Sequence, residues 1–203
     1  MDPGALLLIA ITDGIRDGAD DLLARAAAAV RGGATMLQLR LKDVDARTQV
    51  EVARRLVALR SVPVVVNDRA DIALAAGAAG VHVGADDLPV EAVRRIAPPG
   101  FIIGASVGSD DEVERARGAD YVGIGPVYGT ASKGDAGAAL GVDETARLAR
   151  RCGVPAVGVG GISAVTAAAV TGAGLAGVAV IHAIFAAPDP EQAARSLRAA
   201  IGR

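Results

Sequence analysis

The stretch Pro63-Val64-Val65-Val66-Asn67-Asp68 decides the fold, because an unbroken run of β-branched residues ends there in two polar side chains. A run without alternating polar residues predicts a strand that is buried on both faces, which is typical of a parallel sheet. The same pattern recurs along the whole chain. Similar runs that end in polar or glycine-rich clusters cover residues 6–12, 36–40, 80–83, 101–106, 121–126, 155–160 and 177–181.

Helical patterns fill the intervals between these runs, with apolar residues at three- and four-residue spacing, as in residues 19–32, 46–60, 70–76 and 190–201. Eight strand–helix units in 203 residues predict a single domain over residues 1–203 with the (β/α)8 TIM-barrel fold. The alternative is an open doubly wound sheet. Its dinucleotide fingerprint is missing from the turn after the first run, which reads Thr12-Asp13-Gly14-Ile15.

Composition narrows the classes of function. Lys and Arg number 21 against 23 Asp and Glu, so no basic footprint indicates a nucleic-acid partner, and an anionic ligand needs local charge. The single cysteine, Cys152, excludes an internal disulfide and a cysteine-rich metal site. The apolar run over residues 5–11 is too short for a membrane span or a signal peptide. We therefore expect a cytoplasmic protein with no membrane partner, and the sequence leaves open whether it is a monomer or a homodimer.

Gln38, Arg40 and Lys42 alternate along one predicted strand and its end, so a period of two places all three on the same face. The Arg40 guanidinium can fork onto a phosphate group, and Lys42 adds a compact point charge. The alternative is a strand end whose charges reach solvent or a neighbouring acid. A barrel strand that points two cations inward favours an anionic ligand.

Asn67 and Asp68 end the third predicted strand, and Asp87 follows the fourth. Two carboxylates at neighbouring strand ends can share a hard cation such as Mg²⁺, which takes one or two protein carboxylates together with phosphate oxygens and water. The alternative is that Asp68 caps the helix that follows it and that Asp86 or Asp87 caps the helix over residues 89–97.

Gly160-Gly161-Ile162-Ser163 ends the seventh predicted strand and opens a helix. Glycines allow backbone N–H groups to approach a phosphate, and barrels often bind phosphate after strands seven and eight. His182 closes the eighth strand, where it either donates to such a phosphate or is a satisfied core residue. His82 lies within the fourth strand and is interpreted as structural.

Ser106 ends the fifth predicted strand, and a lone serine at this position is ambiguous between a functional and a structural role. Thr130, Ser132 and Lys133 lie in a glycine-rich loop over residues 129–141 that resembles a mobile lid. Hydroxyls and an ammonium group there suit a second anion, and the alternative is a solvated loop. Without the motifs of covalent or zinc catalysis, this inventory suits a reaction between two phosphorylated small molecules, one of which loses diphosphate.

These motifs, in this order, resemble those of the thiamine phosphate synthase family over residues 11–194. The family's Gln-x-Arg-x-Lys matches residues 38–42, its Asn-Asp-Arg stretch residues 67–74, and its Gly-Val-His-x-Gly motif with a following Asp residues 80–87. Residues 120–128 and 158–162 also match. The resemblance implies that an aminomethylpyrimidine diphosphate and a carboxylated thiazole phosphate form thiamine phosphate, pyrophosphate and carbon dioxide. It implies Mg²⁺ as the cofactor and no protein nucleophile.

The resemblance also assigns a role to each matching residue. Arg40, Lys42 and Lys133 would stabilise the departing pyrophosphate, and Ser106 would face the pyrimidine; these four form the catalytic set. Asp68 and Asp87 would hold Mg²⁺. The substrate-binding set would be Gln38, Arg40, Lys42 and Asn67 on the pyrimidine diphosphate, Thr130, Ser132, Gly161, Ile181 and His182 on the thiazole phosphate, and Lys133 on the diphosphate or pyrimidine.

Two alternatives to this function stay open. A thiazole tautomerase of the same superfamily resembles the synthase, but the relative in question carries a histidine where this chain has Pro126. A barrel that binds a phosphorylated ligand without turnover is the non-enzymatic alternative, because a fold does not guarantee an activity.

Overall fold

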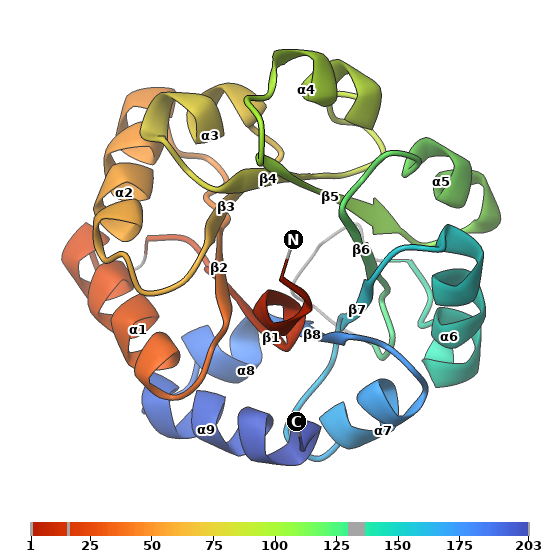
Figure 1. Ribbon diagram of the computed structural model, residues 1–203. Coiled ribbons are helices and arrows are strands. Elements are labelled where there is room, and N and C mark those ends of the chain that lie inside the picture. Colours follow the sequence, from red (N-terminus) through yellow and green to blue (C-terminus); the bar gives the residue numbers. More distant parts are fainter. Residues whose placement is uncertain (1, 16, 130–136, 203) are drawn as a thin grey trace.

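The computed structural model describes residues 2–15, 17–129 and 137–202. Eight parallel strands close into one barrel in chain order, with β8 hydrogen-bonded to β1, as Figure 1 shows from one end. The predicted (β/α)8 TIM barrel is therefore confirmed. The strands are β1 (Leu8–Ile11), β2 (Met36–Leu39), β3 (Val64–Asn67), β4 (Gly80–Val83), β5 (Ile102–Val107), β6 (Tyr121–Ile124), β7 (Ala156–Val159) and β8 (Gly177–Val180).

Helices surround the strands and cover their outer face (Figure 1). They are α1 (Ala19–Arg31), α2 (Ala46–Ala58), α3 (Ala70–Ala76), α4 (Val90–Ile96), α5 (Asp110–Arg115), α6 (Gly141–Cys152), α7 (Ala167–Gly172), α8 (His182–Phe185) and α9 (Pro190–Ile201). Asp45 and Asp189 cap α2 and α9 by accepting hydrogen bonds from backbone N–H groups of the first turn. Within the described ranges, none of these helices has both the length and the apolar character of a membrane span.

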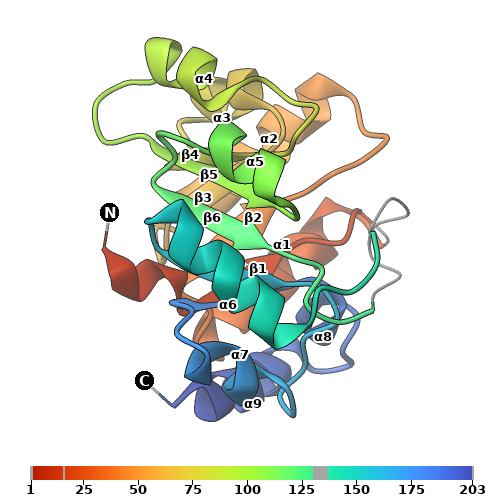
Figure 2. The same ribbon diagram turned by 90° about the vertical axis from the view of Figure 1, so that its right-hand side faces the viewer.

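The ends of the barrel differ from the sequence-based expectation. Leu6 was predicted to start the first strand, but Pro3–Leu6 forms a 3-10 helix, η1, which the Asp2 side chain caps. Proline fixes a helical φ angle, and the aspartate accepts from the Gly4 N–H, so this turn precedes the strand. The last strand ends at Val180, and His182 begins the short helix α8 instead of closing the strand. Figure 2 shows η1 and α8 at opposite ends of the barrel.

The barrel interior is filled by side chains that alternate along the strands. An apolar group from several strands packs with Leu6 of η1 at the N-terminal end: Ile9, Met36, Val65, Tyr121, Val157 and Ala179. Along each strand, every second residue points into the barrel. The inward residues nearer the carboxyl ends of the strands include polar side chains. The buried layer under the candidate site is therefore mostly apolar.

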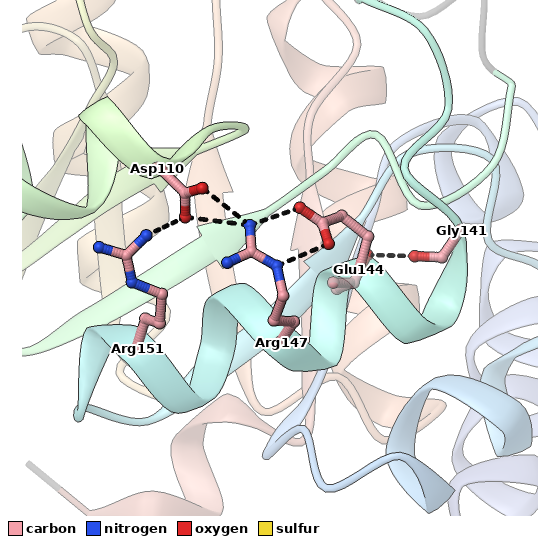
Figure 3. Close-up of polar contacts among 6 residues, drawn as sticks. Asp110, Gly141, Glu144, Arg147 and Arg151 are labelled. Carbon is pink, nitrogen blue, oxygen red and sulfur yellow. Dashed lines mark hydrogen bonds and ion pairs between the residues drawn. The ribbon is translucent and has the colours of Figure 1, made fainter.

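An ion-pair network joins α5 to α6 on the outside of the barrel (Figure 3). Arg147 of α6 donates to both carboxylate oxygens of Asp110 at 3.0 Å and to Glu144 at 2.6 and 2.7 Å. Arg151 also pairs with Asp110. Thr145 donates to the Gly141 carbonyl at 2.7 Å within the first turn of α6. The network anchors the start of α6, where the chain returns from the long loop after β6.

Candidate active site

A cavity of about 890 Å³ opens at the carboxyl ends of the strands, and residues from all eight strands or their following loops line it. Parallel barrels pool side chains in this way because every strand ends on the same rim. The structure brings together every predicted site residue that it describes: Gln38, Arg40, Lys42, Asn67, Asp68, Asp87, Ser106, Gly161, Ile181 and His182. Thr130, Ser132 and Lys133 lie outside the described residues, as does most of the predicted lid.

Arg40 is more buried than Lys42, the other described Lys or Arg of the cavity, and has a relative exposure of 8%. The Thr12 hydroxyl holds its backbone by accepting from the Arg40 N–H at 2.8 Å and donating to the Arg40 carbonyl at 3.0 Å. Among the described residues, the guanidinium Nε has no hydrogen-bond partner. A buried charged donor without a partner is costly, so this group fits an anion that enters the cavity.

The amides of Gln38 and Asn67 meet between β2 and β3. Gln38 Nε2 donates to Asn67 Oδ1 at 3.3 Å, and Gln38 is buried while Asn67 is half-buried. This bond directs the amide NH2 group of Asn67 away from Gln38 and leaves it available as a donor. Both amides line the cavity beside Arg40, which places neutral donors next to the guanidinium.

Neither aspartate occupies the N-cap position of the helix that follows it, so that alternative interpretation is wrong. Arg69 occupies the N-cap of α3 and Pro89 that of α4, and neither makes a side-chain capping bond. Asp68 instead has a φ of 65° and donates its N–H to the His82 carbonyl at 2.7 Å. Asp87 Oδ2 accepts from the Gly84 N–H at 2.7 Å. Left-handed backbone at a non-glycine residue carries strain and is concentrated at functional sites.

The two carboxylates fit a magnesium ion better than a zinc ion. The described part of the chain contains no group of three or more His, Cys, Asp or Glu side chains arranged to hold a metal. Structural and catalytic zinc sites need three or four such ligands, whereas Mg²⁺ uses one or two carboxylates and completes its shell with phosphate oxygens and water. Asp68 and Asp87 both line the cavity wall, as this chemistry requires.

A buried histidine connects two hydroxyl groups in the cavity wall. His82 Nδ1 lies 3.0 Å from the Tyr121 hydroxyl, and His82 Nε2 lies 3.1 Å from Ser106 Oγ. Burial raises the pKa of Tyr121. The sequence marked His82 as structural and did not mark Tyr121. Both residues lie on predicted strands that end in candidate site residues. This position was the signal that could have identified them.

The double glycine after β7 has the backbone that only glycine adopts readily, with φ of 93° at Gly160 and 64° at Gly161. A Cβ atom at Gly161 would lie 2.6 Å from the Gly129 carbonyl oxygen, so the chain leaving β6 packs directly on it. Within the described chain, Gly161 and Ile162 donate no backbone hydrogen bond. Their N–H groups suit a phosphate.

His182 lies at the rim, where Nε2 is 3.1 Å from Asp13 Oδ2, and its side chain is 44% exposed. The interpretation of His182 as a core residue is therefore wrong. Asp13 was missed, although it directly follows the first apolar run and so obeys the same rule as the other strand-end residues.

Glu112 also lines the cavity and was missed. Its Oε2 accepts from the Gly108 N–H at the start of α5, whereas Ser109, the N-cap residue, makes no side-chain capping bond. The spacing Ser109-x-x-Glu112 resembles a capping box and was the available signal.

Comparison with known proteins gives the same family from sequence and from structure. The family model described as thiamine monophosphate synthase matches residues 8–184. A thiamine-phosphate synthase of Roseiflexus sp. (strain RS-1) is 47% identical over 203 residues, covering 98% of this chain and 86% of the relative. That of Methanoculleus marisnigri is 48% identical over 184 residues, covering 87% and 85%. The solved thiamine phosphate pyrophosphorylase of Pyrococcus furiosus superposes with a TM-score of 0.86 at 33% identity, covering 98% and 96%.

Proposed function

The chain belongs to the thiamine monophosphate synthase family and is a thiamine-phosphate synthase, a transferase of thiamine biosynthesis, and we propose that it works by dissociative substitution with Mg²⁺ bound between Asp68 and Asp87. The proposed substrates are 4-amino-2-methyl-5-(diphosphooxymethyl)pyrimidine and a carboxylated thiazole phosphate. The C–O bond to diphosphate breaks, the thiazole nitrogen attacks the pyrimidine methylene, and pyrophosphate and carbon dioxide leave.

The observation that carries this proposal is the Arg40 guanidinium, which is buried in the cavity with an Nε that has no partner among the described residues. A diphosphate group supplies the anionic acceptor that this donor lacks, and a guanidinium can bind it through two parallel hydrogen bonds. Lys42 lies further out at the exposed rim and adds a second positive charge. These cations lower the free energy of the transition state, because negative charge builds on the leaving group.

Bound Mg²⁺ would neutralise charge on the diphosphate oxygens as the C–O bond breaks. Asp68 and Asp87 would hold the ion, and the Gly84 N–H keeps the Asp87 carboxylate oriented. Asn67 and Gln38 would position the diphosphate next to it. Lys133, with Thr130 and Ser132, would complete the site from the loop after β6.

The thiazole phosphate would bind on the opposite side of the rim. The N–H groups of Gly161 and Ile162 would hold the phosphate oxygens, with Ile181 and His182 beside them. The Asp13 carboxylate, whose Oδ2 lies 3.1 Å from His182 Nε2, would hold the imidazole in place. Because two substrates are oriented in one cavity and no protein nucleophile is needed, positioning and electrostatics supply the rate enhancement.

The direct test mixes the purified protein with both phosphorylated heterocycles and Mg²⁺ and measures thiamine phosphate and pyrophosphate together. We expect equal amounts of the two products and no turnover after chelation of the metal. Turnover that is unaffected by chelation would contradict the magnesium assignment. Conversion of the thiazole isomer without the pyrimidine would indicate a tautomerase, and ligand stabilisation without turnover a binding protein. The cytoplasmic location and the homodimer stay predictions.

A further inference from the structure

Three neighbouring strands contribute a continuous hydrogen-bonded chain to the cavity wall. Tyr121 starts β6, His82 lies on β4, and Ser106 lies near the end of β5 between them. The Tyr121 hydroxyl is 3.0 Å from His82 Nδ1, and His82 Nε2 is 3.1 Å from Ser106 Oγ. All three line the cavity. The order from the barrel interior outward is therefore phenol, imidazole, serine hydroxyl.

The strand between them is shaped for this arrangement. A Cβ atom at Gly104 would lie 2.4 Å from Tyr121 Cζ and 2.5 Å from His82 Nδ1. Any larger residue at Gly104 would therefore separate the two rings or displace the β5 backbone. At Gly123, a Cβ atom would lie 3.1 Å from His82 Cε1. The two glycines leave room for the imidazole between the phenol and the serine.

The direction of these hydrogen bonds follows from the buried phenol. Tyr121 is 1% exposed, and His82 Nδ1 is the only hydrogen-bond partner of its hydroxyl among the described residues. Burial raises the pKa of Tyr121, so the phenol keeps its proton. A proton on Nδ1, in the other neutral tautomer or in the imidazolium, would leave the phenol proton without an acceptor, which is costly in a buried site. Tyr121 therefore donates to Nδ1, and His82 carries its proton on Nε2.

The same logic continues to Ser106. Because Nε2–H donates, Ser106 Oγ accepts from His82, and its own proton points elsewhere. Within the described chain no acceptor for this proton is found. We propose that Tyr121 and His82 are positioning residues that fix the Ser106 hydroxyl as a hydrogen-bond donor toward the cavity, where it binds a ring nitrogen of the pyrimidine. This identification rests on the proposed function, in which Ser106 faces the pyrimidine; a ring nitrogen accepts, whereas the exocyclic amine is a donor.

The first test reads the tautomer and needs no substrate. The chain has only two histidines, so ¹⁵N-histidine labelling gives two imidazole spin systems, and a His182→Gln variant assigns the one from His82. In the wild type we expect a protonated Nε2 and an unprotonated Nδ1. Protonation of Nδ1, alone or together with Nε2, would overturn the proposal. This result comes from the wild-type protein and does not depend on the folding of any variant at these three residues.

Two variants provide matched controls for the tautomer. Tyr121→Phe removes the donor to Nδ1, so we expect the Nε2–H preference of His82 to weaken, with both tautomers in exchange. Ser106→Ala removes the acceptor of Nε2–H but keeps the phenol, so the preference should persist. A Tyr121→Phe protein that folds, by circular dichroism, and keeps a single Nε2–H form would contradict the role given to Tyr121.

The second test identifies the ligand atom. Binding of the pyrimidine diphosphate is compared with that of two analogues, each with one ring nitrogen replaced by C–H. In the wild type we expect one analogue to bind roughly tenfold more weakly, and in Ser106→Ala we expect this difference to vanish. Affinity for pyrophosphate should be equal in both proteins. Equal binding of all three pyrimidines to the wild type, or unchanged discrimination in Ser106→Ala, would refute the ring-nitrogen assignment. A missing synthase activity would refute the proposed function and leave the tautomer result intact.

Discussion

At the scale of single residues, the cavity contains polar groups whose conformation or burial costs free energy when no ligand is bound. Arg40 has a buried Nε without a partner among the described residues, and Asp68 has a left-handed backbone. A non-glycine residue in that region costs on the order of 1 kcal/mol or more, and a buried unpaired donor costs a similar amount. Both costs occur in the same cavity, where a ligand can offset the second.

Asp68→Asn and Asp87→Asn should each lower turnover by roughly a hundredfold or more, because the anionic metal ligand is lost. Folding should be little changed, since asparagine tolerates the positive φ of residue 68 and keeps an oxygen for the Gly84 N–H at residue 87. Steady-state rates over a Mg²⁺ titration, with thermal unfolding alongside, measure both effects. Asp71→Asn is the control, since Asp71 pairs with Arg69 outside the cavity. Wild-type rates in both site variants would refute the metal assignment.

Arg40→Lys should weaken pyrophosphate binding about tenfold, because lysine keeps the charge but loses the two-pronged hydrogen bond. Calorimetric titration with pyrophosphate and Mg²⁺ measures this directly. Arg55→Lys on α2 is the matched control, since its partner is Asp20 on the outer surface, and it should bind as the wild type does. Equal affinity in Arg40→Lys and Arg55→Lys would remove Arg40 from the diphosphate site.

At the scale of elements, contacts with neighbouring elements hold the two described ends of the long loop after β6. Gly161 after β7 leaves room for the backbone of residues 128 and 129, and the Tyr128 N–H donates to the Gly160 carbonyl at 3.1 Å. On the other side of the loop, α6 is joined to α5 by the network around Arg147 (Figure 3). These contacts place the two described ends of the loop at the cavity.

Gly161→Ala should raise the KM for the thiazole phosphate strongly, because a methyl group would collide with the Gly129 carbonyl oxygen and displace the phosphate-binding backbone. Gly153→Ala separates this effect from backbone strain. Gly153 has a φ of 67°, close to the 64° of Gly161, but no atom lies within 4 Å of the position that its methyl group would take. Both variants should lose about 1 kcal/mol of stability through backbone strain. Gly161→Ala should lose more because of the collision, and only Gly161→Ala should change the KM. Equal KM values in the two variants would contradict a role for Gly161 in phosphate binding.

Arg147→Ala should lower the melting temperature, and the deficit should shrink in high salt, since the network is exposed and screened. Hydrogen bonds from Arg147 are the main cause that lowers the pKa of Asp110 and of Glu144 from their ordinary values of 3.8 and 4.5. Lowered folded-state pKa values stabilise the protein above the unfolded values, and this stabilisation disappears as the pH falls through the folded ones.

The deficit of Arg147→Ala should therefore be constant near neutral pH and disappear in acid below the ordinary pKa values of the two carboxylates. Melting curves at several pH values check this. Arg150→Ala is the control on the same helix, since Arg150 forms no ion pair within the described chain. A deficit that persists unchanged in acid would show that Arg147 stabilises the fold by packing and not through its carboxylate partners.

At the scale of the whole molecule, a closed barrel explains why one cavity collects groups from across the chain. The strands run parallel in chain order, so each of them delivers its last residues to the same rim. The opposite end is closed by η1 and the apolar interior around Leu6. Ligand binding at the rim therefore couples to the stability of the entire barrel.

Pyrophosphate together with Mg²⁺, at about one hundred times the dissociation constant, should stabilise the folded protein by about 2.7 kcal/mol and raise the melting temperature by roughly 5 to 10 °C. Pyrophosphate after removal of divalent ions should give a much smaller shift. Melting temperatures measured with pyrophosphate, with and without Mg²⁺, give the two shifts to be compared. Equal shifts would indicate that the anion binds without the metal.

The apolar runs in the sequence predicted the barrel, because a strand that is buried on both faces needs a continuous apolar run. Such a run is a local property that can be recognised in each segment separately. The strand-end rule likewise predicted Arg40, Asn67 and Asp87 in one cavity. It did not predict η1 and α8, which are single turns set by local capping and backbone geometry without a long periodic signal. Thr130, Ser132 and Lys133 lie outside the described residues, and their roles stay predictions.

The order of amino acids was sufficient for the barrel and for most of the described residues at its rim, since both depend on where apolar runs stop. Which polar atoms pair with each other, and which are left for a ligand, depends on the register between strands that are distant in the chain. That register places His82 between Tyr121 and Ser106, joins Asp13 to His182, and leaves Arg40 Nε unpartnered within the described chain. Hydrogen bonds act over about 3 Å, so only folding, which brings these atoms within that distance, could assign them.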